Sequence, residues 1–339
     1  MALHNKVNGE LLKQQMCEST EERLTLSFYQ YAKIDDPHAF RNELYRQWEP
    51  LGVMGRTYIA KEGINGQISM PAANFEIFKE RLYSISFLNG VRLNIAVDDD
   101  GKSFFKLKIK VRDKIVADGL DDDSFDVTNG GQHLSAEAFN ELTSREDTVV
   151  VDMRNHYESE VGHFEGAVTP DVDTFRDSLP IVEDILRPHE DKNIVMYCTG
   201  GIRCEKASAW FKHKGFEKVY QLDGGIIQYA REVKAKGLEN KFHGKNFVFD
   251  ERLGERISDE VIAHCHQCGA PCDTHVNCAN VTCNLLFIQC DACAAKYDGC
   301  CSTDCQDFIH LPIEKQIALR KGKDSGVRIF SKGRFKSSV

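Results

Sequence analysis

The chain has 339 residues, too many for one simple hydrophobic core, so two or three domains are expected. Hydrophobic residues make up 42% and charged residues 28%, as in globular proteins, and the net charge of -9 argues against a surface that coats nucleic acid throughout. The first twenty residues are polar and no apolar run of about eighteen residues occurs, so we expect no secretory signal, no membrane partner and a cytoplasmic location.

The elements expected in residues 23–117 follow the order β-α-β-β-α-β, after an N-terminal extension over 1–22. They are a strand in "RLTLSFYQYA", a helix after Asp36-Pro37, two strands in "VMGRTYIAKEGINGQISM" around an Asn65-Gly66 turn, a helix in "NFEIFKERLYSI" and a strand in "FFKLKIKVRDKIV". This order is typical of a ferredoxin-like, or acylphosphatase-like, domain.

The last of these strands alternates cationic with apolar residues, so one face would carry all its cations. They are Lys106, Lys108, Lys110, Arg112 and Lys114. Five cations in register suit contact with RNA phosphates. A solvated sheet face whose lysines protect an edge is the alternative, and the residues alone leave both open.

An acidic linker is expected over 118–131, followed by an α/β domain over 132–235. The apolar runs in "DTVVVDMR", "NIVMYC" and "KVYQLDGG" are typical of buried parallel strands, and helical patterns alternate with them. The remaining segments are a connector over 236–262, a Cys-rich module over 263–312 and a basic tail over 313–339.

The run "NIVMYC" ends at Cys198, and a loop and a helix from about Arg203 follow. A thiolate at this place would lie at the carboxyl end of a parallel strand, beside the free N–H groups of a helix N-terminus. The loop residues are Thr199, Gly200, Gly201 and Ile202. The Cys-x4-Arg spacing is one residue shorter than the Cys-x5-Arg loop of phosphatases, so it suits sulfur or a small oxygen anion better than phosphate. A buried structural cysteine is the alternative.

This loop resembles the active-site loop of rhodanese domains, and "VVVDMRNHYESEVGHFEGAV" and "LDGGI" match the same fold. Together with "IAKEGINGQIS" and the Cys-rich end, nearly the whole chain resembles the bacterial rhodanese-like, TrhO-type tRNA uridine hydroxylases. The resemblance implies oxygen-dependent conversion of the wobble uridine of tRNA to 5-hydroxyuridine. It implies tRNA as partner, molecular oxygen and a reductant as co-substrates, and favours RNA contact by the basic strand.

No P-loop, dinucleotide fingerprint or iron triad is visible, so no nucleotide cofactor is expected and Cys198 itself would activate uracil, as a thiolate or a persulfide. Arg203 would stabilise the anion formed or, equally, clamp the loop. Cys204 is a resolving thiol or a small helical residue. We expect Asp152, Arg154 and Glu158 to support the loop rather than to react. A sulfurtransferase fed by thiosulfate or a donor protein, and a non-catalytic RNA-binding or scaffold protein, are the alternative functions.

Ten of the 13 cysteines lie between residues 265 and 305, and without an export signal they are expected as thiols or metal ligands. They form Cys-x2-Cys and Cys-x4-Cys pairs and a last pair of Cys300 or Cys301 with Cys305. The first and third pairs together can hold one structural zinc ion, and the second and fourth pairs another. The predicted ligands are Cys265, Cys268, Cys278, Cys283, Cys290, Cys293, Cys300 and Cys305. Disulfides, or reduced thiols in a small core, stay open.

Overall fold

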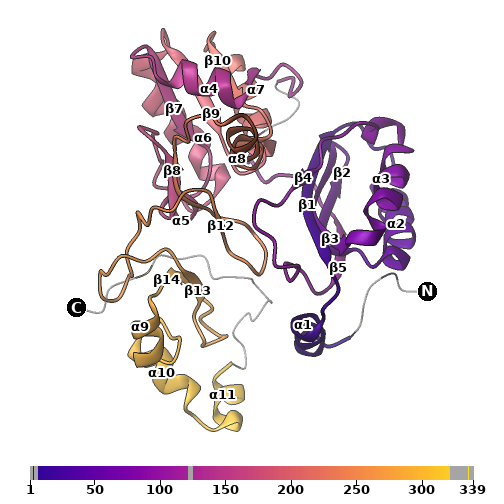
Figure 1. Cartoon of the computed structure of the whole chain (residues 1–339), viewed down its shortest axis with the longest axis vertical. Coiled ribbons are helices and arrows are strands. Elements are labelled where there is room, and N and C mark those ends of the chain that lie inside the picture. The colour runs from indigo at the N-terminus through magenta and orange to yellow at the C-terminus, as the bar shows by residue number, and fades with distance from the viewer. Residues whose placement is uncertain (1–2, 4–6, 121–124, 321–334, 336–339) are drawn as a thin grey trace.

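Three units follow one another in the computed structural model, which describes residues 3, 7–120, 125–320 and 335 (Figure 1). The predicted fold class, a ferredoxin-like domain, a parallel α/β domain and a Cys-rich module, is confirmed. The predicted basic residues of the tail after Arg320 and part of the acidic linker lie outside the described residues. Within the described ranges, every helix is too short or too polar to cross a bilayer.

The N-terminal domain is a five-stranded sheet with two helices on one face (Figure 1). Its helices pack Trp48 and Phe78 onto the sheet, and Asp36 caps the first of them through the backbone N–H groups of residues 38 and 39. The sheet order is β4-β1-β3-β2-β5. The elements are α1 (Gly9–Glu18), β1 (Arg23–Tyr31), α2 (Pro37–Trp48), β2 (Met54–Ala60), β3 (Gly63–Pro71), α3 (Phe75–Tyr83), β4 (Asn94–Ile95) and β5 (Leu107–Val111).

One prediction for this domain is wrong, and one strand was not predicted. Asn65 and Gly66 lie inside β3, paired with β2, and the hairpin turns at Lys61 and Glu62 instead. The last predicted strand, β5, lies parallel to β2 at one edge, while the two-residue β4 pairs with β1 at the other edge. A strand of two residues has no readable alternation, so its pattern could not reveal it.

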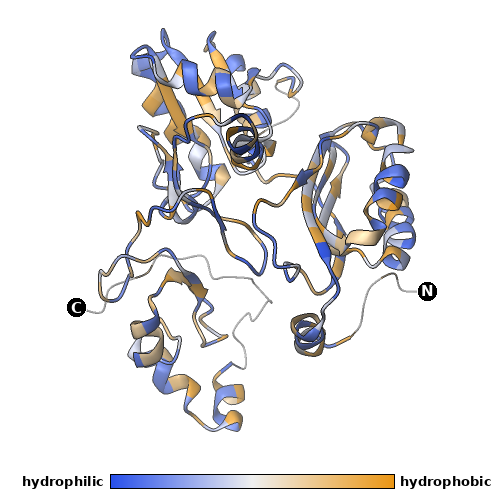
Figure 2. Ribbon diagram, viewed as in Figure 1, coloured by the Kyte–Doolittle hydropathy of each residue, from blue (hydrophilic) through white to orange (hydrophobic). Residues whose placement is uncertain are grey.

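The α/β domain has a parallel sheet of order β6-β10-β9-β7, enclosed by helices. All five residues of the central β9 are buried, which explains its uninterrupted apolar run. Hydrophobic residues accordingly concentrate on the strands of this sheet (Figure 2). The elements are β6 (Gln132–Leu134), α4 (Ala136–Thr143), β7 (Thr148–Asp152), α5 (His156–Ser159), β8 (Gly162–Phe164), α6 (Phe175–Leu186), β9 (Asn193–Tyr197), α7 (Ile202–His213), β10 (Val219–Leu222) and α8 (Gly225–Lys236).

The segment 236–262, expected as a connector, carries two strands that join β8 in a small sheet of order β12-β11-β8. The Cys-rich module that follows has one hairpin and short helices, the last of which begins the segment expected as a tail. These elements are β11 (Phe242–Asn246), β12 (Glu255–Arg256), β13 (His275–Asn277), β14 (Leu286–Ile288), α9 (Asp291–Lys296), α10 (Thr303–Ile309) and α11 (Ile313–Arg320).

A buried ion cluster joins the N-terminal domain to α7. The ammonium of Lys206, on α7, lies 2.6 Å from a carboxylate oxygen of Glu62 in the β2–β3 turn and 2.7 Å from one of Asp118. The Lys206 side chain is 1% exposed and that of Asp118 is fully buried. Glu62 also accepts the backbone N–H of Ile115 at 2.7 Å, so one carboxylate ties the hairpin turn to the chain after β5.

We expect Lys206→Ala to lower the free energy of unfolding by about 3–5 kcal/mol, because it removes the buried cation that Glu62 and Asp118 share and leaves Lys114 as the cation beside Asp118. Urea denaturation followed by tryptophan fluorescence measures the change. The matched control is Lys234→Ala, an exposed helical lysine on α8, which should change stability by about 0.5 kcal/mol or less. A loss of about 1 kcal/mol or less for Lys206→Ala would show that the cluster does not hold the domains together.

Candidate active site

Cys198 directly follows β9 and is 1% exposed. Its Sγ accepts a hydrogen bond from the backbone N–H of Gly201 at 3.1 Å. Gly201 has a φ of +101°, in the left-handed region, and a Cβ there would lie 2.7 Å from the hydroxyl oxygen of Tyr29. Glycine is therefore required at this position both by the loop backbone and by the approach of the N-terminal sheet.

The electrostatic surroundings of Cys198 favour its thiolate. Burial by itself raises the pKa of the thiol, but the thiol of Cys204, the charge of Arg203 and the backbone N–H groups of these two residues lower the pKa to about 6. Burial, and then the hydrogen bond to Cys198, raise the pKa of Cys204 well above its ordinary value. Cys204 thus stays protonated and donates to Cys198, a role that the sequence did not distinguish from simple packing.

The N-terminus of α8 closes the other side of the loop. The carbonyl oxygen of Cys198 accepts the N–H of Ile226 at 3.0 Å, and that of Thr199 accepts the N–H of Ile227 at 3.2 Å. A Cβ on Gly225 would lie 2.5 Å from the Cys198 carbonyl oxygen, and its φ is +66°. The Gly-Gly turn in "LDGGI" therefore serves a close approach of α8 to the loop.

Arg203 is held by a carboxylate. Its two terminal nitrogens donate to the two oxygens of Glu158 at 2.6 and 2.8 Å, and one of them lies 3.5 Å from Thr199 Oγ1. This bidentate pair is buried and fixes the helix to the turn that carries Glu158. The geometry favours the clamp interpretation of Arg203, although the same residue lines the cavity described below and lowers the Cys198 pKa.

Asp152 and Arg154 form a second buried pair, at the end of β7. The guanidinium of Arg154 lies 2.6 Å from a carboxylate oxygen of Asp152 and donates to the carbonyl of Gly162 at 2.6 Å. These two side chains and Glu158 do not line the cavity next to Cys198. Their supporting role stays a prediction.

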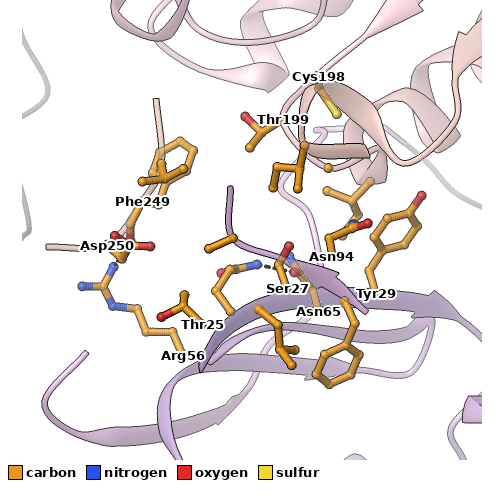
Figure 3. Close-up of a pocket in the computed structure, with 18 of the residues that line it drawn as sticks. Thr25, Ser27, Tyr29, Arg56, Asn65, Asn94, Cys198, Thr199, Phe249 and Asp250 are labelled. Atoms are coloured by element: carbon orange, nitrogen blue, oxygen red, sulfur yellow. Dashed lines mark hydrogen bonds between the residues drawn. The ribbon is translucent and has the colours of Figure 1, made fainter. Parts of the chain in front are cut away.

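A cavity of about 460 Å³ lies between the Cys198 loop and the N-terminal sheet (Figure 3). The sheet presents to it the face opposite α2 and α3, so alternate polar residues of four strands point toward the loop. Residues of the segment after β11 close one end. Its polar lining includes Thr25, Ser27, Tyr29, Arg56, Tyr58, Asn65, Gln67, Asn94 and Asp250.

Asn94 is a site residue that the sequence did not reveal. It is 4% exposed, and its Oδ1 has no hydrogen-bond partner among the residues that the structure describes. Its Nδ2 lies 3.6 Å from the place where a Cβ on Gly200 would be, so the carboxamide faces the loop. A buried carboxamide with an unused acceptor is costly unless a ligand satisfies it. One asparagine in a two-residue strand carries no signal of this role.

The basic row is shorter than predicted because β5 ends at Val111. Lys108 and Lys110 lie in the strand, opposite Arg56 and Tyr58 of β2, with Lys106 and Arg112 at its ends. Burial, and then the neighbouring cations Arg56, Lys106 and Lys110, lower the pKa of Lys108. Lys114 does not join the row: its ammonium lies 2.7 Å from the buried carboxylate of Asp118.

The cysteines of the last module gather into two clusters of four. In each, the four sulfur atoms lie within 4.8 Å of one another, a spacing that suits one metal ion. The clusters are Cys265, Cys268, Cys290 and Cys293, and Cys278, Cys283, Cys301 and Cys305. The predicted ligand Cys300 is wrong: it is fully buried in the core of the module, and its neighbour Cys301 takes the fourth place. Spacing alone could not separate two adjacent cysteines.

Three known families match this chain, one in each part of it. The family described as "UPF0176 acylphosphatase like domain" matches residues 23–115, "Rhodanese-like domain" matches 135–232 and "Rhodanase C-terminal" matches 243–306. Proteins named tRNA uridine(34) hydroxylase from Pectobacterium atrosepticum and Photorhabdus laumondii are 60% and 57% identical to this chain. Each alignment covers 98% of this chain, and 94% and 95% of the two relatives.

We expect the alkylation rate of Cys198 to rise with pH around a midpoint near 6 and to level off above about 7.5, because only the thiolate reacts. Iodoacetamide labelling from pH 5 to 9, read on the Cys198 peptide by mass spectrometry, measures it, with the exposed Cys17 as reference for the reagent. Cys204→Ala should move the midpoint upward, since it removes a hydrogen bond to the thiolate, and Cys204→Ser should move it less. A wild-type midpoint at the ordinary value of about 8.5 would contradict the analysis.

Proposed function

The chain belongs to the family of tRNA uridine(34) hydroxylases, and from this premise we propose that Cys198 activates uridine 34 of tRNA for hydroxylation at C5. The observation that carries the proposal is the position of Cys198, a cysteine with a lowered pKa that lines a cavity faced by polar groups of a second domain. A base must leave the stack to enter such a cavity, as in other enzymes that modify bases.

In the proposed reaction the Cys198 thiolate adds to C6 of uracil, and negative charge develops at C5 and O4. C5 then bonds to molecular oxygen, and protonation gives a hydroperoxide at C5. A two-electron donor and two protons cleave the O–O bond, leaving a hydroxyl at C5 and releasing water. Loss of the C5 proton and of the thiolate from C6 restores the double bond. The net reaction consumes one O2, two electrons and two protons for each 5-hydroxyuridine and water formed.

The loop groups support each change in charge at the sulfur. The Gly201 amide and the Cys204 thiol donate hydrogen bonds to Cys198 while it is a thiolate, and the nearby Arg203 charge adds to them. Since Glu158 holds Arg203, this charge stays in place when the sulfur bonds to carbon and when it leaves.

Asn94 is suited to hold the edge of the uracil ring. Its carboxamide offers a donor for O4 and an acceptor for N3–H, and its unused Oδ1 gives the acceptor no competing partner among the described residues. A hydrogen bond to O4 also strengthens as negative charge develops there. Asn94 therefore both positions uridine and stabilises the adduct in this proposal.

Four cations beside the cavity suit the phosphates of the tRNA. Arg56 lines the cavity, Lys108 and Lys110 lie on the neighbouring strand β5, and Arg112 directly follows that strand. The overall charge of -9 leaves this row as a local basic surface on an acidic protein.

The two cysteine clusters are proposed as structural zinc sites. Four thiolates in each cluster suit tetrahedral zinc with no open position. Backbone N–H groups of Cys290 and Cys301 donate to the sulfurs of Cys265 and Cys278 at 3.4 Å, which stabilises the thiolate form that a metal needs.

We expect cells whose only copy is Cys198→Ser to lack 5-hydroxyuridine-derived nucleosides in tRNA, while wild-type complementation restores them. Nucleoside mass spectrometry in a strain without other routes measures this. Loss of thiolated nucleosides instead would indicate a sulfurtransferase, and unchanged nucleosides a binding protein.

The variant Asn94→Ala tests the role of the cavity, because it changes the cavity lining and leaves the Cys198 loop intact. It should lower hydroxylation by about 10²–10³-fold, the effect of removing one donor to a developing oxyanion, without changing the Cys198 alkylation midpoint. Wild-type activity in this variant would remove Asn94 from the mechanism.

We expect two zinc ions per chain, and one in Cys301→Ser, because that change removes a ligand from one cluster only. The matched control is Cys300→Ser, the adjacent cysteine outside both clusters, which should keep two. Elemental analysis of protein prepared without chelators gives the stoichiometry. Equal zinc content in the two variants would contradict the ligand assignment.

A further inference from the structure

A second cavity, of about 370 Å³, lies next to the first. Tyr58, Asn65, Val116 and Phe249 line both, so these residues form the wall between them. The second cavity also touches α5 of the α/β domain and the β13–β14 hairpin of the Cys-rich module. All three units of the chain therefore meet around it, whereas the mechanism at Cys198 makes no use of it.

Flat rings dominate the lining of this cavity. Tyr157, Phe249 and Phe287 come from three different segments, and Tyr58 comes from the N-terminal sheet. The ring of Phe335 lies stacked on that of Phe287, with centroids 5.7 Å apart and planes 15° from parallel. Two rings of the cavity wall therefore already stack face to face.

One buried polar atom points to a ligand rather than to simple packing. His275, on β13, lines the cavity and is 8% exposed, and its Nε2 has no hydrogen-bond partner within the described ranges. Burial lowers the pKa of His275 to about 4, so the ring is neutral near pH 7. A neutral imidazole offers one donor and one acceptor, and leaving either unused in a buried place is costly.

We propose that the second cavity binds a nucleobase next to uridine 34 of the anticodon loop, stacked on its aromatic rings with a polar edge toward His275 Nε2. The inference rests on the proposed function, because a polynucleotide whose uridine lies at Cys198 carries a second base one nucleotide away. Unstacked bases of RNA loops are bound in this way, by aromatic rings and edge hydrogen bonds.

The cationic row can bind the phosphate that joins uridine 34 to the neighbouring nucleotide. Lys110 is opposite Tyr58 in the β2–β5 pair, and the guanidinium carbon of Arg112 lies 5.8 Å from the centre of the Tyr58 ring. Since Tyr58 belongs to the wall between the cavities, a backbone that crosses this wall passes beside both cations.

The test measures binding of anticodon stem-loop RNAs to the full chain by fluorescence anisotropy at one fixed salt concentration. The RNAs are the intact loop and loops with an abasic nucleotide at position 33 or at position 35. One of the two abasic loops should bind wild-type protein about tenfold more weakly, the effect of losing one stacked base. The proposal would be overturned if the wild-type protein bound both abasic loops with an affinity within about twofold of its affinity for the intact loop.

Two variants connect that loss to this cavity. Tyr157→Ala should bind the intact loop about tenfold more weakly and lose nothing further with the abasic loop. His275→Phe keeps the ring and removes the nitrogen, and should weaken only the loops that retain the base. The exposed His264→Phe, outside the cavity, is the matched control and should bind all loops as wild type does.

Thermal unfolding of each variant identifies any variant that fails to fold. The comparison of abasic and intact loops uses wild-type protein, so it does not depend on the folding of a variant. Binding is read without turnover, so failure of hydroxylation at uridine 34 is observed separately, as absence of 5-hydroxyuridine in the intact loop. If Tyr157→Ala and His275→Phe lose the same factor on abasic and intact loops, the base lies elsewhere and the proposal fails.

Discussion

The position of the N-terminal sheet over the Cys198 loop depends on the buried ammonium of Lys206. This residue lies on the helix that begins at the loop, one turn after Arg203, and its two carboxylate partners belong to segments of the N-terminal half. Separating a buried ammonium from its carboxylates is strongly unfavourable, so the pairing with Glu62 and Asp118 holds α7 against the N-terminal domain. In that arrangement the polar face of the sheet meets the Cys198 loop and the cavity lies between them.

The site divides its charges between two tasks. Arg203 is neutralised by Glu158 as a structural pair, yet its remaining field and the donors around it keep Cys198 ionised near neutral pH. The Cys204 thiol stays protonated because burial, and then its hydrogen bond to Cys198, raise its pKa. In the proposed function, recognition of the base falls to the other domain, through groups such as Asn94. Chemistry and recognition thus come from different units, joined by the Lys206 cluster.

The loop, its helix and the cysteine pairs could be predicted because each is a local pattern. The apolar run before Cys198 and the glycines after it specify strand, turn and helix within a few residues. The failures have equally physical reasons. The two residues of the β2–β3 turn, Lys61 and Glu62, include no glycine, so the rule for hairpin turns pointed to the Asn65-Gly66 pair, which lies inside β3. Lys114 keeps the alternation of the basic row in sequence but lies beyond the end of β5, where Asp118 binds it.

The sequence by itself determined the fold class of the first two domains, the nucleophile candidate and the grouping of eight cysteines into two sets of four, since short-range periodicity and residue spacing encode all three. Only the tertiary structure decided what those units do to one another. It placed Asn94 opposite the Cys198 loop, chose Cys301 over Cys300 and enclosed a second, aromatic cavity among all three units. Such contacts join residues far apart in the chain, and buried charges and steric limits that no local pattern contains select them.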